Sequence, residues 1–180
     1  MIKYLENTIL KLRALEPSDI ELLYQWENDT SLWRVSNTLT PFSRHTLSKY
    51  IESAHLDIFE VKQLRLMIDL KDEESIVTIG TIDLFDFDPY HSRAGVGILI
   101  ADKSQRNKGF ASGALDLLIK YCFEMLQMHQ LYCNITTDNK ASLKLFANTG
   151  FQIVGEKKDW IKTINSWVGE YLLQLLKEEE

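Results

Sequence analysis

Apolar and polar positions along the chain follow two periods, and each period predicts a different kind of element. Short apolar or alternating runs predict seven strands, at 8–13, 64–68, 76–85, 95–101, 131–135, 152–156 and 167–176. Four segments predict helices, at 18–27, 44–56, 110–125 and 139–150. The third is the clearest helix, because its apolar side chains recur at the helical period on one stripe: Phe110, Ala114, Leu117, Leu118, Tyr121 and Met125.

Capping residues mark where two of these helices begin and end. Ser18-Asp19-Ile20-Glu21 fits a capping box after Pro17. Asn139 is a suitable N-cap for the last helix, and Gly150 a suitable C-terminal cap.

The order of the elements predicts an α+β fold. The early strands are joined by short turns, such as the polar turn at 71–74, so they must pair antiparallel. The run 95–101 is nearly all apolar and predicts a central strand that is buried on both faces. We therefore expect a mixed, largely antiparallel sheet of six to seven strands, flanked by about four helices. No repeat or Ser/Gly/Pro-rich linker interrupts the chain, so residues 1–180 are expected to form a single domain.

The charge composition limits the classes of molecule that the protein is expected to bind. Aspartate and glutamate number 26 against 20 lysines and arginines, a formal charge of −6 at pH 7. This sign is wrong for nucleic acid or an anionic lipid surface and suits a cationic small molecule such as an amine. No apolar run reaches 18 residues and the N-terminus has no signal-peptide pattern, so we expect no membrane partner and a cytoplasmic location. Cys122 and Cys133 do not form a metal motif and are expected to be buried, reduced thiols.

The most informative segment is the loop at 101–111, between the central strand and the clearest helix. Its Arg106-x-x-Gly109-x-Ala111 pattern puts small residues where the backbone turns into a helix. Free N–H groups and the positive end of the helix dipole make such a junction a phosphate site. Lys103, Arg106 and Lys108 add positive charge to an otherwise acidic chain. The loop therefore predicts a phosphate-bearing ligand.

Two motifs at this spacing resemble those of a known family. Residues 93–101 followed by Arg106-Asn107-Lys108-Gly109-Phe110-Ala111 resemble the acetyl-CoA-binding motif of the GNAT N-acetyltransferases. Residues 139–151 resemble the second motif of that family, an asparagine, a helix and then Gly-Phe. The resemblance extends over the whole chain and is greatest to the branch of ribosomal-protein N-terminal and spermidine acetyltransferases.

The resemblance implies a fold, a cosubstrate and residue roles. The sheet would be splayed between its fourth and fifth strands, and acetyl-CoA would enter that gap. Asn139 would bind the pantetheine arm, and the following helix would lie along the cosubstrate. The implied cofactor-binding residues are Leu99, Ile100, Ala101, Arg106, Asn107, Lys108, Gly109, Phe110, Ala111, Asn139, Ser142 and Phe146.

The chain departs from the family at the positions that move protons. Phe146 stands where many members have an acidic tyrosine, and Ser142 or a water is the expected substitute. Gly95 and Asn134 stand where some members have a glutamate base. We expect the catalytic candidates to be Ser142, Asp83 and Asn134, with Asp86, Asp88 and His91 as further groups able to accept a proton.

Glu27, Asp29 and Trp33 lie near the expected amine entrance and are the candidates for binding the acceptor. The expected reaction is direct attack of a primary amine of a small molecule, such as a polyamine or diamine, on acetyl-CoA. Two alternatives remain open: acetylation of a protein N-terminal α-amine, or a CoA-binding protein that has lost catalysis. No metal is expected. An apolar edge left open by the last strands would support a homodimer.

Overall fold

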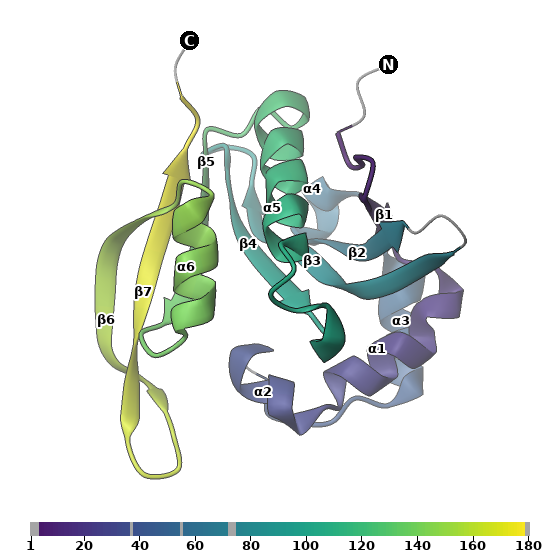
Figure 1. The fold of residues 1–180 in the computed structure, drawn as a ribbon, viewed down its shortest axis with the longest axis horizontal. Coiled ribbons are helices and arrows are strands. Elements are labelled where there is room, and N and C mark those ends of the chain that lie inside the picture. Colours follow the sequence, from purple (N-terminus) through teal and green to yellow (C-terminus); the bar gives the residue numbers. More distant parts are fainter. Residues whose placement is uncertain (1–3, 37, 55, 72–74, 179–180) are drawn as a thin grey trace.

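A computed structural model describes residues 4–36, 38–54, 56–71 and 75–178. Its centre is one seven-stranded sheet with the order β1-β2-β3-β4-β5-β7-β6 (Figure 1). All neighbouring strands run antiparallel except β4 and β5. The strands are β1 (Leu10–Ala14), β2 (Leu64–Lys71), β3 (Ile76–Asp88), β4 (Arg93–Ile100), β5 (Gln130–Thr136), β6 (Gln152–Lys162) and β7 (Trp167–Leu176). This confirms the predicted α+β class with a largely antiparallel sheet.

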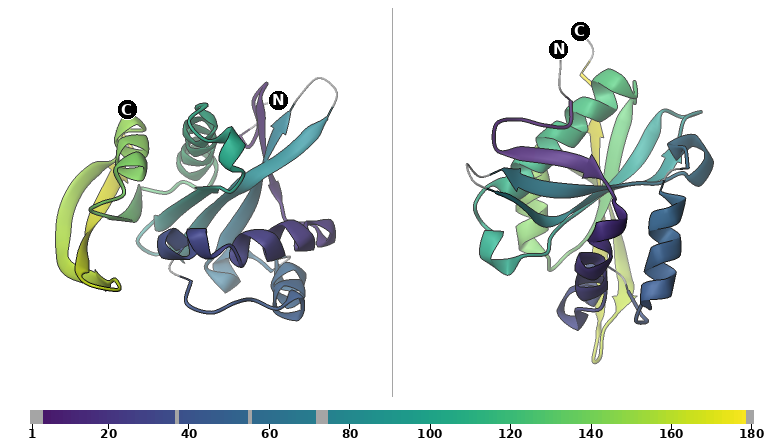
Figure 2. Two further views of the ribbon diagram at one scale, coloured as in Figure 1. Left: turned by 60° about the horizontal axis from the view of Figure 1, so that its bottom comes forward. Right: turned by 90° about the vertical axis from the view of Figure 1, so that its right-hand side faces the viewer.

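Six α-helices among the described residues cover the two faces of the sheet. They are α1 (Ile20–Glu27), α2 (Thr30–Ser36), α3 (Arg44–Ser53), α4 (Ile58–Val61), α5 (Phe110–Lys120) and α6 (Lys140–Asn148). Helices α5 and α6 lie on one face, and α1, α2 and α3 lie on the other (Figure 2). No helix in the described part of the chain is long and apolar enough to span a membrane.

Alternation along the strands divides the apolar side chains between two cores. Leu66 and Ile68 of β2 point toward α5 and join the larger core, with Leu115 and Leu118. Met67 points the opposite way, into the smaller core with α1 and α3. This period of two places every second residue of a strand on the same face as α1.

The sheet opens between β4 and β5, as the family resemblance implies. These strands pair only at Arg93↔Gln130, Ala94↔Leu131 and Gly95↔Tyr132. Beyond Gly95, β4 stays paired with β3 and β5 stays paired with β7, so the two halves of the sheet diverge. The predicted burial of the 95–101 strand on both faces is therefore wrong in part: residues 97–99 are half-buried, because no strand covers the open edge of β4.

Three other local predictions need correction. The first cap lies two residues earlier than expected, because the Asp19 carboxylate accepts a hydrogen bond from the Glu16 N–H at 2.8 Å. Met125 leaves the apolar stripe and is exposed, because α5 continues into a π-helical turn over 121–125 that shifts the helical phase. Helices α2 and α4 were not predicted, since both are too short for a periodic pattern. The predicted turn residues 72–74 lie outside the described residues.

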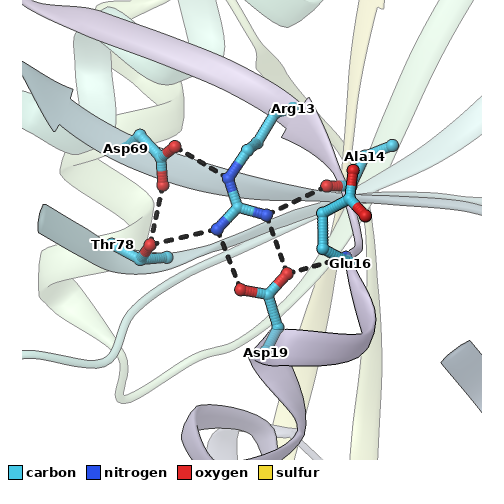
Figure 3. A network of polar contacts seen from close by, with 6 residues as sticks. All are labelled: Arg13, Ala14, Glu16, Asp19, Asp69 and Thr78. Atoms are coloured by element: carbon cyan, nitrogen blue, oxygen red, sulfur yellow. Dashed lines mark hydrogen bonds and ion pairs between the residues drawn. The ribbon is translucent and has the colours of Figure 1, made fainter. Parts of the chain in front are cut away.

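A buried ion cluster fixes the start of the first helical segment to the sheet (Figure 3). The Arg13 guanidinium donates to Asp69 at 2.8 Å and to both oxygens of Asp19, at 2.7 and 2.9 Å. Thr78 donates to the second oxygen of Asp69, and the Glu16 N–H donates to Asp19. Every carboxylate oxygen of this cluster is therefore hydrogen-bonded within the protein, which is typical of a structural network.

Candidate active site

The loop after β4 forms a ring of backbone donors at the N-terminus of α5. Asn107 and Gly109 both have positive φ, 61° and 85°, which turns the chain sharply before Phe110. Gly109 is the N-cap of α5, and no atom lies within 4 Å of where its Cβ would be. Free N–H groups therefore face an open space at the positive end of the helix dipole. The side chain of Asp102 stiffens the loop by accepting from the Ser104 N–H at 2.8 Å.

The three cations of the loop have separate partners. The Arg106 side chain folds back and donates to the Ile100 carbonyl at 2.8 Å, so it fastens the loop to the end of β4. Lys108 donates to Gln105 at 3.1 Å. Lys103 reaches across to α2, where it donates to the Ser31 hydroxyl at 3.3 Å. Lys103 and Lys108 are exposed, so both can turn toward an anion without breaking the core.

The open edge of β4 begins directly beside this loop. The Ala101 N–H donates to the Ile79 carbonyl at 2.9 Å and so points toward β3. Backbone groups alternate in direction along an antiparallel ladder, so those of Ile98 and Ile100 point to the open side. The Ile100 carbonyl is held by Arg106, which leaves the backbone of Ile98 and the Ile100 N–H facing the gap.

Helix α6 begins on the other side of the gap, after β5. The Asn139 carboxamide oxygen caps the helix by accepting from the Ser142 N–H at 3.1 Å, as the sequence predicted. The Nδ2 group of Asn139 donates to none of the described residues and remains available. Phe146 lies on the inner side of the helix, 3% exposed, with its ring edge-on to Phe151 at 5.0 Å.

Helix α2 crosses the mouth between the two halves of the sheet (Figure 1). At one end Asp29 pairs with Lys103 of the loop after β4, at 3.7 Å. Near the other end Arg34 forms an ion pair with Asp138, which follows β5. The Trp33 indole N–H donates to the Glu27 carbonyl at 2.7 Å, so this aromatic ring is anchored to the end of α1. The helix therefore connects both sides of the opening through side chains.

On the face toward α1, glycines of β4 leave room beside the gap. Gly95 pairs with Phe85 and Gly97 pairs with Asp83 across β3 and β4. A Cβ at Gly97 would lie 3.8 Å from the Phe85 ring and 4.0 Å from the Asp83 Cβ. Because Gly97 has no side chain, no side chain at this position of β4 separates Asp83 from the open edge.

Asp83 belongs to a cluster of three charged side chains. The Arg65 guanidinium donates to Asp83 at 2.6 Å and to Glu27 at 2.6 Å, so one cation serves two carboxylates. All three side chains are 17–20% exposed. Burial raises the pKa of Asp83, and the neighbouring Arg65 charge opposes that shift without cancelling it. A carboxylate with a raised pKa beside an open edge is suited to accept a proton.

The opposite wall of the gap carries Asn134, which is exposed on β5. Its side-chain oxygen accepts from Lys157 at 3.1 Å, and Lys157 also pairs with Glu170 of β7 at 2.5 Å. A hydroxyl lies nearer the fork of the sheet, where Tyr132 donates to Asp86 at 3.1 Å and burial raises its pKa to about 12. A groove of about 520 Å³ continues along this face beyond Tyr132, lined in part by Asp86 and Asp88.

Comparisons with known proteins agree with this architecture. Residues 10–152 match the Acetyltransferase (GNAT) domain family. The chain belongs to the GNAT acetyltransferase family. It is 29% identical over 171 residues to the Uncharacterized N-acetyltransferase p20 of Bacillus licheniformis, covering 94% of each chain. It is 25% identical over 150 residues to the Spermidine N(1)-acetyltransferase of Escherichia coli K12, covering 82% of this chain and 75% of the relative.

A solved structure of the same fold is that of spermidine N-acetyltransferase from Vibrio cholerae in complex with CoA and spermine. Its TM-score is 0.82 at 23% identity, and the match covers 94% of this chain and 96% of that one. As a GNAT acetyltransferase the protein is an N-acetyltransferase, and its acetyl donor is acetyl-CoA. The predicted family, enzyme class and cosubstrate are confirmed.

The residues around the gap of this GNAT acetyltransferase fit acetyl-CoA. The left-handed residues Asn107 and Gly109 leave the helix N-terminus open to a pyrophosphate, where any side chain at 109 would project into the space. The free edge of β4 at Ile98 and Ile100 offers hydrogen bonds to an amide-bearing arm. The Nδ2 group of Asn139, at the start of α6, has no acceptor among the described residues and can donate to such an arm. Among the described residues, no group of three His, Cys, Asp or Glu side chains could hold a metal ion.

The sequence did not predict four residues of this candidate site: Arg65, Tyr132, Lys157 and Glu170. Lys157 lies in the charged run 156–159 of β6, where nothing distinguishes it from its neighbours. The other three are polar side chains within largely apolar strands, and that isolation was the available signal. It identifies a residue that needs a partner, but it does not say which strand supplies the partner. Arg65 meets Asp83 only because β2 and β3 pair in that register.

Proposed function

We propose that the protein acetylates a primary amine of a small cationic molecule, such as a polyamine or diamine, and that Asp83 accepts the proton that the amine loses. The observation that carries this proposal is the cluster at Asp83: two carboxylates share one guanidinium beside a glycine that leaves the open edge of β4 accessible. An ammonium group suits this negative wall, and the curated relatives from E. coli are named for spermidine.

The proposed cosubstrate contacts follow the geometry of the gap. The N–H groups at residues 106–111, including those of Asn107, Lys108, Phe110 and Ala111, would hold the pyrophosphate. Ile98 and Ile100, together with neighbouring Leu99 and Ala101, would line the pantetheine arm opposite Asn139. Phe146 would support the helix beside the arm. When bound, acetyl-CoA supplies a thioester carbonyl that a neutral amine attacks, and the C–S bond breaks as the C–N bond forms.

The chain's own groups then move two protons. Asp83 takes one from the ammonium nitrogen before attack, because only the neutral amine has a free electron pair. An alkyl amine has a pKa near 10.4, so its deprotonation at pH 7 costs about 4.6 kcal/mol without a base. As the amide forms, the nitrogen loses a second proton, and the Ser142 hydroxyl, at the start of α6, would pass that proton to the leaving thiolate as it receives it. Asn134 would act only through hydrogen bonds, because a carboxamide does not take up a proton, and its oxygen already accepts from Lys157.

The acceptor would enter from the face of α1. Asp29 and Trp33 belong to the segment at α2 that crosses the mouth, and Glu27, at the end of α1, is already part of the Asp83 cluster. The groove beyond Tyr132, with Asp86 in its lining, would take the rest of an extended cation. We also propose that residues 1–180 form one domain, and that the exposed Ile153 and Val154 of edge strand β6 support a homodimer.

The test is release of free thiol from acetyl-CoA by the purified protein. The panel contains spermidine, spermine, putrescine, aminoglycosides, free amino acids and short N-terminal peptides. A matched sample carries Asn139→Ala with Gly109→Glu. We expect thiol release that depends on a small polyamine or diamine and is lost in the variant. Release with N-terminal peptides alone would assign the protein to α-amine acetylation. Acetyl-CoA binding without release across the panel would contradict the proposed function.

A further inference from the structure

Arg65 is the residue that organises the acceptor face. It lies on β2 directly opposite Asp83, and its guanidinium spans from that carboxylate to Glu27 at the end of α1. The Tyr50 ring supports it from α3, 5.5 Å from the guanidinium carbon, and Gln63 lies 3.4 Å from the Tyr50 hydroxyl. Arg65 is therefore held from three elements, α1, α3 and β3.

The oxygens of this cluster are not fully bonded. Asp83 uses Oδ1 for the short bond to Arg65, and its Oδ2 has only a 3.5 Å contact with the same guanidinium. Glu27 Oε1 is bonded, and Oε2 has no partner among the described residues. No buried side-chain oxygen in the described part of the chain lacks a hydrogen bond, so this free oxygen is reachable from outside.

The cluster at Arg13 shows what a completed version looks like (Figure 3). There, too, one arginine binds two carboxylates, those of Asp19 and Asp69. Both Asp19 oxygens accept from Arg13, and the Thr78 hydroxyl donates to the one Asp69 oxygen that Arg13 does not reach. Both of those aspartate side chains are 4% exposed, against 17% for Asp83 and 19% for Glu27. Both clusters thus have one arginine for two carboxylates. The carboxylates at Arg13 are buried and fully hydrogen-bonded, whereas those at Arg65 are partly exposed and keep unused oxygens.

We propose that Arg65 is a positioning residue that holds the carboxylates of Asp83 and Glu27 together as the binding site for the ammonium group of the acceptor. Arg65 neutralises one of the two negative charges, and the ammonium group neutralises the other. This inference rests on the proposed function. With the acceptor in place, two cations face two anions, and the ammonium proton lies next to Oδ2 of Asp83, which has only the 3.5 Å contact with Arg65. Arg65 thereby binds no substrate itself and acts through the two carboxylates.

The geometry requires a guanidinium. Its planar fork reaches two carboxylates at 2.6 Å each, whereas a lysine ammonium is a single point charge on a flexible chain. Lysine at this position would keep the charge and lose the simultaneous contact. Glutamine would remove the charge as well, leaving two carboxylates to repel each other. The charged groups that face Asp83 are Arg65 from β2 and Glu27 from α1, while β4 presents only Gly97.

The experiment compares Arg65→Lys, Arg65→Gln and Asp83→Asn with Arg13→Lys, the matched change in the cluster at Arg13. Two acceptors are used: the best amine of the panel, and its aminooxy analogue, whose nitrogen is already neutral at pH 7. For the amine, we expect kcat of Arg65→Gln to fall about 100-fold, the range of a lost general base, while KM does not rise. For the aminooxy analogue the loss should stay under about tenfold, because no proton must be removed before attack.

The pH profile and the affinity for acetyl-CoA provide further readouts. Losing a neighbouring cation raises a carboxylate pKa, so the acidic limb of kcat/KM should move up by roughly one to three pH units in Arg65→Gln. Arg65→Lys should shift it less. Acetyl-CoA affinity, measured by calorimetry, should be unchanged in every Arg65 variant. Arg13→Lys should lower the melting temperature and leave the acidic limb of the kcat/KM profile unshifted.

The outcomes separate this inference from the proposed function. No amine-dependent thiol release in the unmodified protein contradicts the function itself. Release that Arg65→Gln leaves intact would overturn only the role of Arg65. Equal losses for the amine and the aminooxy analogue, with an unmoved pH limb, would also overturn it and make Arg65 a structural residue like Arg13.

Discussion

The ring of Phe85 occupies the space that a side chain at Gly95 would need. A Cβ built on Gly95 would lie 2.2–2.6 Å from three carbons of that ring. Phe85 also meets Tyr132 of β5 edge-on, with ring centroids 5.9 Å apart. The two aromatic rings therefore close the fork of the sheet where β4 and β5 last pair. A glutamate at position 95, which some family members have, has no room in this protein.

This relationship predicts a strong coupling between the two positions. Gly95→Ala should lower the free energy of unfolding by about 1–3 kcal/mol, because the ring must move. Gly97→Ala is the matched control: its nearest neighbour would be 3.8 Å away, so the change should be within about 0.5 kcal/mol. Urea unfolding measures both. The double change Phe85→Leu with Gly95→Ala should be less destabilising than the sum of the singles, and strict additivity would contradict the clash.

The helix N-terminus at Gly109 should determine acetyl-CoA affinity. Gly109→Glu forces a side chain onto a left-handed residue and puts a negative charge where the pyrophosphate is proposed to lie. We expect acetyl-CoA to bind at least about tenfold more weakly by calorimetry, a change of about 1.4 kcal/mol. Gly155→Glu is the control, since its Cβ also points into open space but lies on β6. Equal affinity in the two variants would rule out the loop as the phosphate site.

Ser142 should matter for the rate and not for folding. Its N–H, not its hydroxyl, completes the cap at Asn139, so Ser142→Ala keeps the helix. Protonating a thiolate of pKa near 8.5 at pH 7 gains about 2 kcal/mol, so kcat should fall by up to about 30-fold. Thr149→Ala, at the other end of α6, removes a hydrogen bond to the Phe146 carbonyl and should affect only the melting temperature. An unchanged kcat in Ser142→Ala would assign the proton donor to water.

The ion pair between Arg34 and Asp138 should slow the exchange of CoA. It joins α2 to the half of the sheet that carries α6, so it acts across the opening. Both side chains are largely exposed, which limits the pair to at most about 1 kcal/mol and the expected acceleration of CoA release in Arg34→Glu to roughly fivefold. Stopped-flow displacement measures the rate. The charge swap Arg34→Glu with Asp138→Arg should restore it, and failure to do so would show that the pair is not the cause.

The two cysteines should not react with a thiol reagent while the protein is folded. Cys122 and Cys133 are free and buried, and burial raises the pKa of each thiol to about 12. The reactive thiolate is therefore scarce at pH 8. Ellman's reagent should label no protein thiol before denaturation and both thiols after it. Rapid labelling of the native protein would contradict the burial of these side chains.

Much of the architecture follows from local patterns. The stripe from Phe110 to Leu118 produced α5, and the run at Trp167–Leu176 produced β7 with the predicted ends. These patterns are dependable because the apolar period and the length of an element are properties of adjacent residues. Short elements behave differently. Helix α2 has no long apolar stripe, and it forms where its ends pair with Lys103 and Asp138.

The sequence by itself determined the family and the cap at Asn139, and it predicted the loop at 101–111 as the phosphate site, because each depends on residues close together in the chain. Only the tertiary structure decided which charges act together. Arg65, Asp83 and Glu27 come from β2, β3 and α1, and their 2.6 Å contacts exist because strand register and helix packing bring them to one face. Likewise, the sequence does not distinguish Gly95 from Gly97, because both are small residues in one strand. In the folded sheet the Phe85 ring covers Gly95, and Gly97 stays open. Long-range contacts of this kind depend on the packing of the whole fold, which no local pattern in the chain specifies.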